Sequence, residues 1–415
     1  MIFSMKWFSS AVLLSVLVGA MAAHAATRQA NSCSANDVKS AISSASPGDT
    51  VAVPGGTCSW SGGGISISGI TLMGAGKTTS GTVITSGGVA MTKHASQITR
   101  LSGFRFSGSD VHGSIGGSPS ARAYVIDNNY FYSSGGAIFF TISANGGVFH
   151  HNDFFTPPSS AGGPDALPLH PNEDWSQATT FGNADKQGPS GGERNIYFED
   201  NTFTNILETA PDGDQGARVV IRHNQYIDSS IVFHGGGPVN DTSSDGHRQF
   251  EIYNNTFQRV NCNDNLNKWI WVRGGSGVIA NNVMDTVSTS CYGNKVEISL
   301  GVGCSGLPSY PLLHQIGQTT APSTQNPPSQ PLLIFGNTGA GTSDPNFVVI
   351  GANDTGGGGH SCSSPESYVR AGRDYMTNNS WGWTPYTYPH PLSSGSGGNT
   401  GTGPTPPTGV QAVAN

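Results

Sequence analysis

One short pattern recurs along the chain and limits what it can fold into. Each copy is a strand-like run ending in Asn, with an apolar residue three positions before that Asn and another two positions after it. The aligned residues are Asn129, Asn152, Asn201, Asn224, Asn255 and Asn282. A unit of this size cannot enclose a hydrophobic core alone, so neighbouring copies must stack on one another. The pattern therefore predicts a solenoid.

The spacing of the copies adds detail to this prediction. Successive Asn residues lie 23 to 31 positions apart, except for a gap of 49 between Asn152 and Asn201. That gap holds either a complete extra coil or a long loop. Weaker copies at residues 70–74, 101–106 and 333–337 extend the array in both directions. Asn suits a sharp bend because it tolerates a left-handed backbone, and its amide can bond the Asn one coil away.

Composition agrees with an all-β chain and excludes several other classes. The sequence has 58 Gly and 25 Pro, and only 11% of its residues are charged. Long helices are built largely from Glu, Lys, Arg, Ala and Leu, and the charged members of this set are scarce here. An aromatic content of 9% and a net charge of −7 argue against disorder. The lack of a basic surplus argues against a nucleic-acid partner.

The repeat resembles that of the right-handed parallel β-helix proteins, the pectin-lyase-like superfamily, over residues 32–392. This resemblance implies a right-handed parallel β-helix solenoid with long loops. Residues 36–42 are predicted to form a short amphipathic helix capped by Ser34 or Asn36, followed by a first strand at residues 49–54. In that superfamily such a helix covers the N-terminal end of the coil. The aromatic, Pro-rich residues 383–392 predict a cap at the other end.

Both ends of the chain differ in composition from the repeat region. Residues 1–25 contain Lys6, an apolar run and Ala23-His24-Ala25, the pattern of a secretory signal peptide. The apolar run is short for a membrane span, although a retained anchor is the alternative. We therefore expect a secreted monomer, extracellular or periplasmic, whose β-helix domain covers residues 26–392. Residues 393–405 form a Gly/Ser/Thr linker, and residues 406–415 resemble the start of a truncated fibronectin-III-like module.

All six cysteines follow the expected cleavage site, and an even number in an exported chain favours disulfides. Proximity in the sequence suggests three pairs, with other connectivities open: Cys33–Cys58, Cys262–Cys291 and Cys304–Cys362. The chain has no Cys-x-x-Cys pair, which argues against a zinc site.

Strand alternation predicts an outward strip of chemically useful side chains. In residues 269–273, Ile270 and Val272 should face inward, leaving Trp269, Trp271 and Arg273 outside. Aligning the preceding coil places Phe233 against Val272 and His234 beneath Arg273. The strip also receives residues from flanking coils, namely Glu208, Asp212 and Asp214 before it and Glu297 after it.

This combination suits an acidic polysaccharide. Indole faces stack on sugar rings, and Arg binds carboxylates in bidentate fashion. In a uronate the proton on C5 is mildly acidic, so a base can remove it and the glycosidic oxygen leaves by β-elimination. The resemblance implies an Arg or Lys base with Ca²⁺ as the neutralising cation. We therefore predict Arg273 as the base and Lys268 and His234 as competitors or partners. The predicted Ca²⁺ ligands are Glu208, Asp212 and Asp214, although Asp212-Gly213-Asp214 also reads as an ordinary turn.

A second outward column contains His150, Glu199 and Arg222, just before the aligned Asn. A surface ion-pair ladder is the favoured explanation of this column, with a ligand site as the alternative. His247 and Arg248 close a long loop at residues 235–246 and could overhang the groove. The predicted substrate-binding residues are Trp269, Trp271, Arg222, His247, Arg248 and Glu297.

Two other functions stay open. The polygalacturonase-type hydrolases of this superfamily use an adjacent Asp pair, which this sequence lacks, although Glu208 and Glu297 could serve a hydrolase. A non-catalytic carbohydrate-binding or adhesion β-helix is the third hypothesis. His234-Gly235 is similar to the Arg-His-Gly segment of alginate and chondroitin lyases of β-helix type, but Phe233 replaces the Arg. The full arginine-containing signatures of the pectate lyases are also absent.

Overall fold

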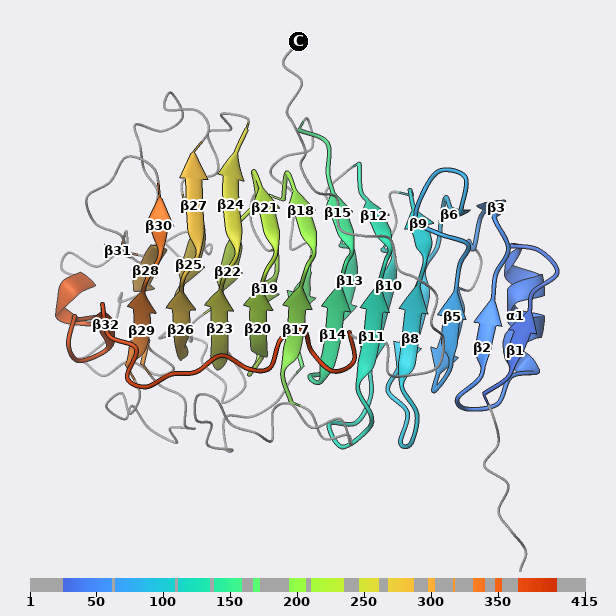
Figure 1. The fold of residues 1–415 in the computed structure, drawn as a ribbon, viewed down its shortest axis with the longest axis horizontal. Helices are drawn as coiled ribbons and strands as arrows, with labels where there is room; N and C mark the ends of the chain where they lie inside the picture. The colour runs from blue at the N-terminus through green and yellow to red at the C-terminus, as the bar shows by residue number, and fades with distance from the viewer. Residues whose placement is uncertain are drawn as a thin grey trace, which may run out of the picture.

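Three long parallel sheets wind along one axis and make a parallel β-helix (Figure 1). The computed structural model describes residues 25–61, 64–108, 111–134, 138–158, 167–171, 194–206, 210–234, 246–260, 268–286, 298–302, 316–317, 331–339, 348–352 and 365–393. Each coil contributes one strand to each sheet, as β11, β12 and β13 do in turn. The predicted all-β solenoid is confirmed.

Sheet A has 12 strands, in the order β1-β2-β5-β8-β11-β14-β17-β20-β23-β26-β29-β32. Their bounds are β1 (Thr27–Gln29), β2 (Thr50–Ala52), β5 (Thr71–Met73), β8 (Thr99–Ser102), β11 (Tyr124–Asp127), β14 (Gly147–His150), β17 (Ile196–Glu199), β20 (Arg218–Arg222), β23 (Gln249–Tyr253), β26 (Ser276–Ala280), β29 (Leu332–Phe335) and β32 (Tyr375–Thr377).

Sheets B and C have 10 strands each. Sheet B consists of β3 (Gly56–Cys58), β6 (Thr82–Ile84), β9 (Phe104–Phe106), β12 (Tyr130–Tyr132), β15 (Asp153–Phe155), β18 (Thr202–Thr204), β21 (Gln225–Ile227), β24 (Thr256–Arg259), β27 (Val283–Thr286) and β30 (Thr338–Gly339). Sheet C consists of β4 (Ile65–Ser68), β7 (Val89–Thr92), β10 (Gly113–Gly116), β13 (Phe140–Ile142), β16 (Pro168–Leu169), β19 (Asp212–Gly213), β22 (Ile231–Phe233), β25 (Ile270–Val272), β28 (Ile298–Val302) and β31 (Val348–Ala352).

The aligned Asn residues form a continuous buried ladder between sheets A and B. The backbone N–H and Nδ2 of Asn129 both donate to Oδ1 of Asn152, each at 3.1 Å. The same paired contacts join the rest of the ladder: Asn152, Asn201, Asn224, Asn255, Asn282 and Asn337. Asn152 bonds Asn201 directly and β14 pairs with β17, so the long gap is an insertion within one coil. The left-handed residue is the one before each Asn, as in His223 with φ 56°.

The apolar positions on both sides of the Asn face the interior, as predicted. Inside sheet B the aromatic rings of neighbouring coils stack, with centroids 5.0 Å apart for Phe154 and Phe203 and 4.8 Å for Phe203 and Tyr226. On sheet A, Phe149 and Phe198 stack at 4.7 Å. Parallel strands one coil apart place identical positions directly above one another, so each inward column becomes a continuous apolar stack.

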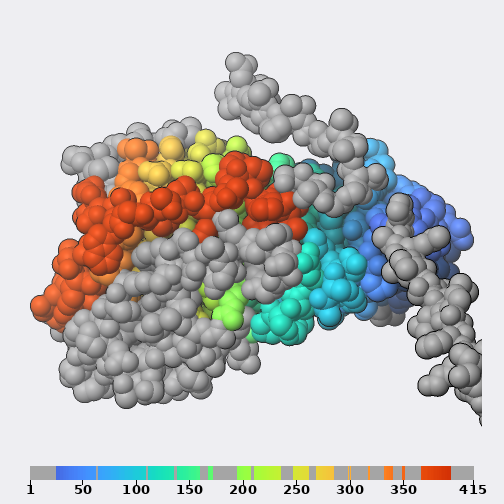
Figure 2. Space-filling view, turned by 60° about the horizontal axis from the view of Figure 1, so that its bottom comes forward, coloured from blue at the N-terminus to red at the C-terminus, as the bar shows by residue number. Residues whose placement is uncertain are grey.

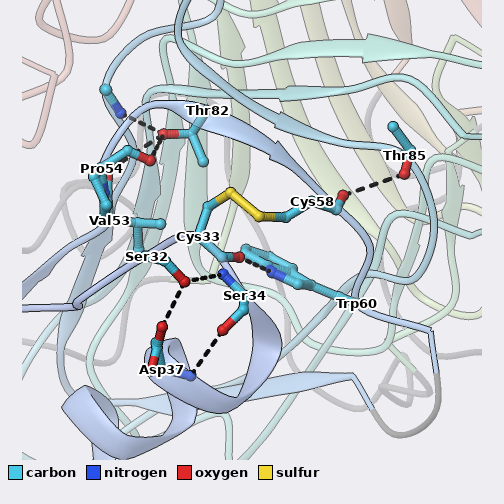
Figure 3. Close-up of a disulfide and its surroundings, with 11 residues drawn as sticks. Ser32, Cys33, Ser34, Asp37, Val53, Pro54, Cys58, Trp60, Thr82 and Thr85 are labelled. Carbon is cyan, nitrogen blue, oxygen red and sulfur yellow. Dashed lines mark hydrogen bonds between the residues drawn. A yellow bond between two sulfur atoms is a disulfide. The ribbon is translucent and has the colours of Figure 1, made fainter.

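A short helix covers the N-terminal end of the coil. Helix α1 (Ala35–Ser43) begins after Ser34, whose side chain accepts a hydrogen bond from the Asp37 backbone N–H, and it buries Val38 and Ala41. Beside it the predicted Cys33–Cys58 disulfide is confirmed, and the Trp60 indole donates to the Cys33 carbonyl at 2.9 Å (Figure 3). The other predicted cysteine pairs, Cys262–Cys291 and Cys304–Cys362, lie outside the described residues.

The C-terminal segment is a strap along the side of the coil, which corrects the predicted end cap. After the 3-10 helix η4 (Pro365–Ser367) and β32, residues 378–393 run back across the outer face of sheet A from β29 towards β14 (Figures 1 and 2). Tyr386 of this strap lies in an apolar cluster with Tyr197, Val220 and Leu333. In the described part of the chain no helix is long and apolar enough to cross a membrane.

Candidate functional site

Four polar residues follow one another at the ends of the sheet C strands. Backbone bonds fix their register: Asp214 N–H to the Leu169 carbonyl at 3.1 Å, His234 N–H to Gly213 at 2.8 Å, and Arg273 N–H to Phe233 at 3.0 Å. The successive residues on this edge are therefore His170, Asp214, His234 and Arg273. The predicted placement of His234 beneath Arg273 is confirmed by the pairing of β22 with β25.

His234 and Asp212 form the chemically distinctive pair of this edge. The Nε2 atom of His234 lies 3.0 Å from Oδ1 of Asp212. The Asp212 side chain is 2% exposed, whereas the His234 side chain is 35% exposed. A carboxylate held against one ring nitrogen orients an imidazole and leaves its other nitrogen to take a proton. The accessible histidine can therefore act as an oriented base.

Trp271 holds two cations next to this pair. The Lys268 ammonium lies 3.7 Å from the indole centroid, and the Arg273 guanidinium carbon lies 4.7 Å from it. Trp271 points outward as predicted, but its side chain is only 8% exposed. Its indole therefore positions Arg273 and Lys268 through cation–π contacts and offers little surface for a sugar ring.

Trp269 does not belong to this site. It is buried in the core, with its ring 5.5 Å from that of Phe257 and the Arg259 guanidinium 4.6 Å above it. Strand β25 begins at Ile270, so Trp269 occupies the corner before it, where strict alternation does not apply. The prediction that Trp269 lies on the outer face is therefore wrong.

His247 and Arg248 are also buried, and they do not overhang a groove. The His247 ring stacks on Phe233 with centroids 4.0 Å apart, and its Nε2 lies 2.9 Å from the Gln249 carbonyl oxygen. Burial lowers the pKa of His247 to about 3, so the ring is neutral at ordinary pH. Neither residue is placed to bind substrate.

Arg222 faces outward but lies beneath the strap. Its guanidinium donates to Glu199 Oε2 at 3.0 and 2.8 Å, to the Tyr253 hydroxyl at 2.9 Å and to the Tyr386 carbonyl at 3.0 Å. Burial alone would raise the pKa of Glu199, but Arg222, the Ser393 hydroxyl and the His390 N–H together lower this pKa. Arg222 therefore forms a buried ion pair with Glu199 at the position where the sequence predicts a substrate contact.

The predicted calcium ligands do not form a cluster in the described residues. Asp212 contacts His234, and Asp214 Oδ1 accepts the backbone N–H groups of Gln215 and Gly246 at 2.8 and 2.7 Å. Among the residues that the structure describes, no three His, Cys, Asp or Glu side chains converge as a metal site would require. Glu208 and Glu297 lie outside the described residues.

Sequence reasoning had not singled out His170 and had assigned Asp212 to a metal. Aligning Leu169 with Gly213 and Phe233 would have brought His170 into the column, but β16 and β19 have only two residues each and carry almost no alternation.

Comparison with protein-family models, curated proteins and solved structures finds no match to this chain.

Proposed function

We propose that this chain is a secreted polysaccharide lyase of the pectin-lyase-like superfamily, cleaving a uronate-containing polysaccharide by β-elimination at the outer face of sheet C. The observation that carries the proposal is the contact between His234 and the buried Asp212, one strand away from Arg273. A base and a fixed cation at neighbouring positions are what proton abstraction next to a carboxylate requires.

His234 takes the role that the sequence had suggested for Arg273. A guanidinium stays protonated at any ordinary pH, so Arg273 suits carboxylate binding better than proton abstraction. Two N–H groups of the Arg273 guanidinium can clamp the uronate carboxylate, with Lys268 adding a second positive charge on the same indole. That positive charge stabilises the enolate that develops when the C5 proton leaves.

The reaction balances without an oxidant or reductant. The His234 imidazole takes the proton from C5 while the C5–H electron pair forms the C4–C5 double bond. The bond from C4 to the glycosidic oxygen breaks, and that oxygen receives a proton from the imidazolium or from water. Asp212 lies against Nε2 of His234 and orients the ring during the transfer. Calcium binding by Glu208, Asp212 and Asp214 stays a prediction from the sequence, and no step here passes through a metal.

The test is incubation of the purified protein with polygalacturonate, alginate and glucuronan, following the ultraviolet absorbance of the unsaturated uronate product. His234→Ala should lower kcat by about 10²- to 10⁴-fold, the usual contribution of a general base. Asp212→Asn should also lower kcat, whereas Arg273→Gln should mainly raise KM. Thr141→Ala, on the same outer face two strands before β19, is the matched control and should leave turnover unchanged.

Two outcomes would indicate an alternative function, and two others test His234 and calcium. New reducing ends without the unsaturated product would indicate a hydrolase, and binding without cleavage would indicate a carbohydrate-binding or adhesion protein. Wild-type turnover in His234→Ala would exclude His234 as the base. Chelation with EDTA tests calcium separately, since unchanged activity would contradict a required metal.

A further inference from the structure

Sheet B carries a second cluster of aromatic side chains that the proposed reaction does not use. Strands β12 and β15 are neighbours in this sheet (Figure 1). Their outward positions are occupied by Tyr130, Tyr132 and Phe155, all half-buried. These strands precede the coils that carry Asp212 and His234, and their sheet is a different face of the β-helix.

The rings are arranged as a platform. Tyr132 and Phe155 lie in register, with centroids 5.9 Å apart and planes within 17° of parallel. The Arg105 guanidinium lies 3.9 Å above the centroid of Tyr130, one coil away. The Tyr132 and Phe155 rings thus stack across neighbouring coils, and both remain partly exposed on the outer face of sheet B.

Charged side chains border this platform. Lys77 forms a 2.8 Å ion pair with Asp153, and the two side chains are 32% and 38% exposed. Asp153 lies in register with Tyr130, so Arg105, Tyr130 and Asp153 make one column beside the Tyr132 and Phe155 rings. With two cations against one carboxylate, the border is net positive and complements an anionic ligand.

We propose that this platform is a second, non-catalytic binding site for an acidic polysaccharide. Aromatic faces stack on the C–H faces of sugar rings, and the tyrosine hydroxyls can bond sugar hydroxyls. Arg105 binds a uronate carboxylate through its planar fork. The inference takes the ligand class from the proposed function, and the site holds the polymer on a face away from the reacting residues.

Binding is measured in the full-length protein carrying His234→Ala, so that the probes stay intact. The probes are polygalacturonate and alginate, with dextran as the neutral polymer, in affinity gel electrophoresis. The Tyr132→Ala/Phe155→Ala variant should bind the acidic probes at least about tenfold more weakly, as expected for loss of aromatic anchors. Arg105→Gln should weaken the same binding and reduce its salt dependence.

Trp381→Ala is the matched control, because this indole is 58% exposed but belongs to the strap. It should bind as the parent does, and equal melting temperatures show that all variants are folded. Equal affinity of the double variant and the parent, or no binding of the parent to either acidic probe, would overturn the proposal. Binding lost in the double variant while the native protein yields no unsaturated product would refute the lyase alone. Product formation with unchanged binding would refute the platform alone.

Discussion

His247 shows how a polar side chain can substitute for core packing. The inward position on β19 is Gly213, and a Cβ there would lie 2.1 Å from His247 Nδ1. The imidazole therefore occupies the space above this glycine and stacks on Phe233 of the next coil. A buried neutral imidazole makes the free energy of unfolding depend on pH, because the unfolded chain binds a proton at this histidine where the folded chain does not.

We predict that protonation of His247 in the unfolded chain lowers stability in acid. Burial lowers the pKa of His247 from 6.5 to about 3. The neutral ring therefore contributes fully to the free energy of unfolding above the unfolded-state pKa of 6.5. This contribution is lost as the pH falls from that value towards the folded-state pKa. In that window the slope is about 1.4 kcal/mol per pH unit. Urea unfolding from about pH 7 to about pH 4.5 should therefore give a flatter curve for His247→Gln than for the wild type. Parallel curves would contradict a buried neutral ring.

Single residues at the corners were the hardest part of the site to predict. Alternation correctly put Trp271 outside, but Trp269 lies before β25 and turns into the core. His247 lies before β23 for the same reason, and only the register shows that it covers Gly213. The pairing of His234 with Asp212 was missed because residues in different coils meet through register, which the short strands β16 and β19 conceal.

The Asn ladder was predicted because its cause is local and repeated. Each member needs the same bend and the same apolar neighbours, so the pattern is visible in the sequence. Asn224 shows the energetic role of one member: its Oδ1 accepts both donors of Asn201, while its Nδ2 donates to the Phe198 carbonyl and to Asn255.

We predict that Asn224→Ala destabilises the protein by about 3 kcal/mol or more, because it leaves several buried donors and acceptors unpaired. Chemical denaturation measures the loss. Asn254→Gly is the control, since Asn254 is exposed and has φ 56°, which glycine adopts freely. The free energy of unfolding of Asn254→Gly should stay within about 0.5 kcal/mol of the wild-type value. A comparable loss in both variants would argue against the ladder as the cause.

At the scale of elements, a buried ion pair of sheet A holds the end of the strap. Glu199 and Arg222 are both fully buried, at 2.8 Å. The Glu199 carboxylate also accepts the His390 N–H at 3.0 Å and the Ser393 hydroxyl, while Arg222 binds the Tyr386 and Thr387 carbonyls. Strand alternation predicted that the Glu199 and Arg222 side chains face outward from sheet A. It did not predict that residues 378–393, far along the chain, would cover them.

We predict that Arg222→Met lowers the free energy of unfolding by about 3–5 kcal/mol, because it leaves the Glu199 carboxylate buried without its counter-charge. Adding Glu199→Gln should recover part of that loss, so the two substitutions are non-additive in a double-mutant cycle measured by urea unfolding. Lys77→Ala breaks the partly exposed pair with Asp153 and should cost no more than about 1 kcal/mol. Additive effects at Glu199 and Arg222 would mean that the pair is not coupled.

For the whole molecule, the strap completes a core that the coil alone leaves open. The inward faces of the sheets are filled by stacked rings, but the outer face of sheet A also bears apolar residues: Val148, Tyr197, Val220, Val278 and Leu333. Trp383 and Tyr386 cover them, and the Trp383 indole donates to Glu251 at 3.0 Å. The strap crosses several coils, so it couples units that otherwise contact only their neighbours.

We predict that a chain ending at Thr377 folds with its sheet A face exposed, so it melts at a lower temperature, binds a hydrophobic dye and aggregates on heating. A chain ending at Ser393 keeps the strap and should melt with the full-length protein. Since His234 and Asp212 lie on sheet C, the shorter chain should still cleave uronate polymer at temperatures where it remains folded. Equal melting of the two truncated chains would show that the strap adds nothing to the core, whereas loss of cleavage in a folded short chain would place the reacting residues under the strap instead.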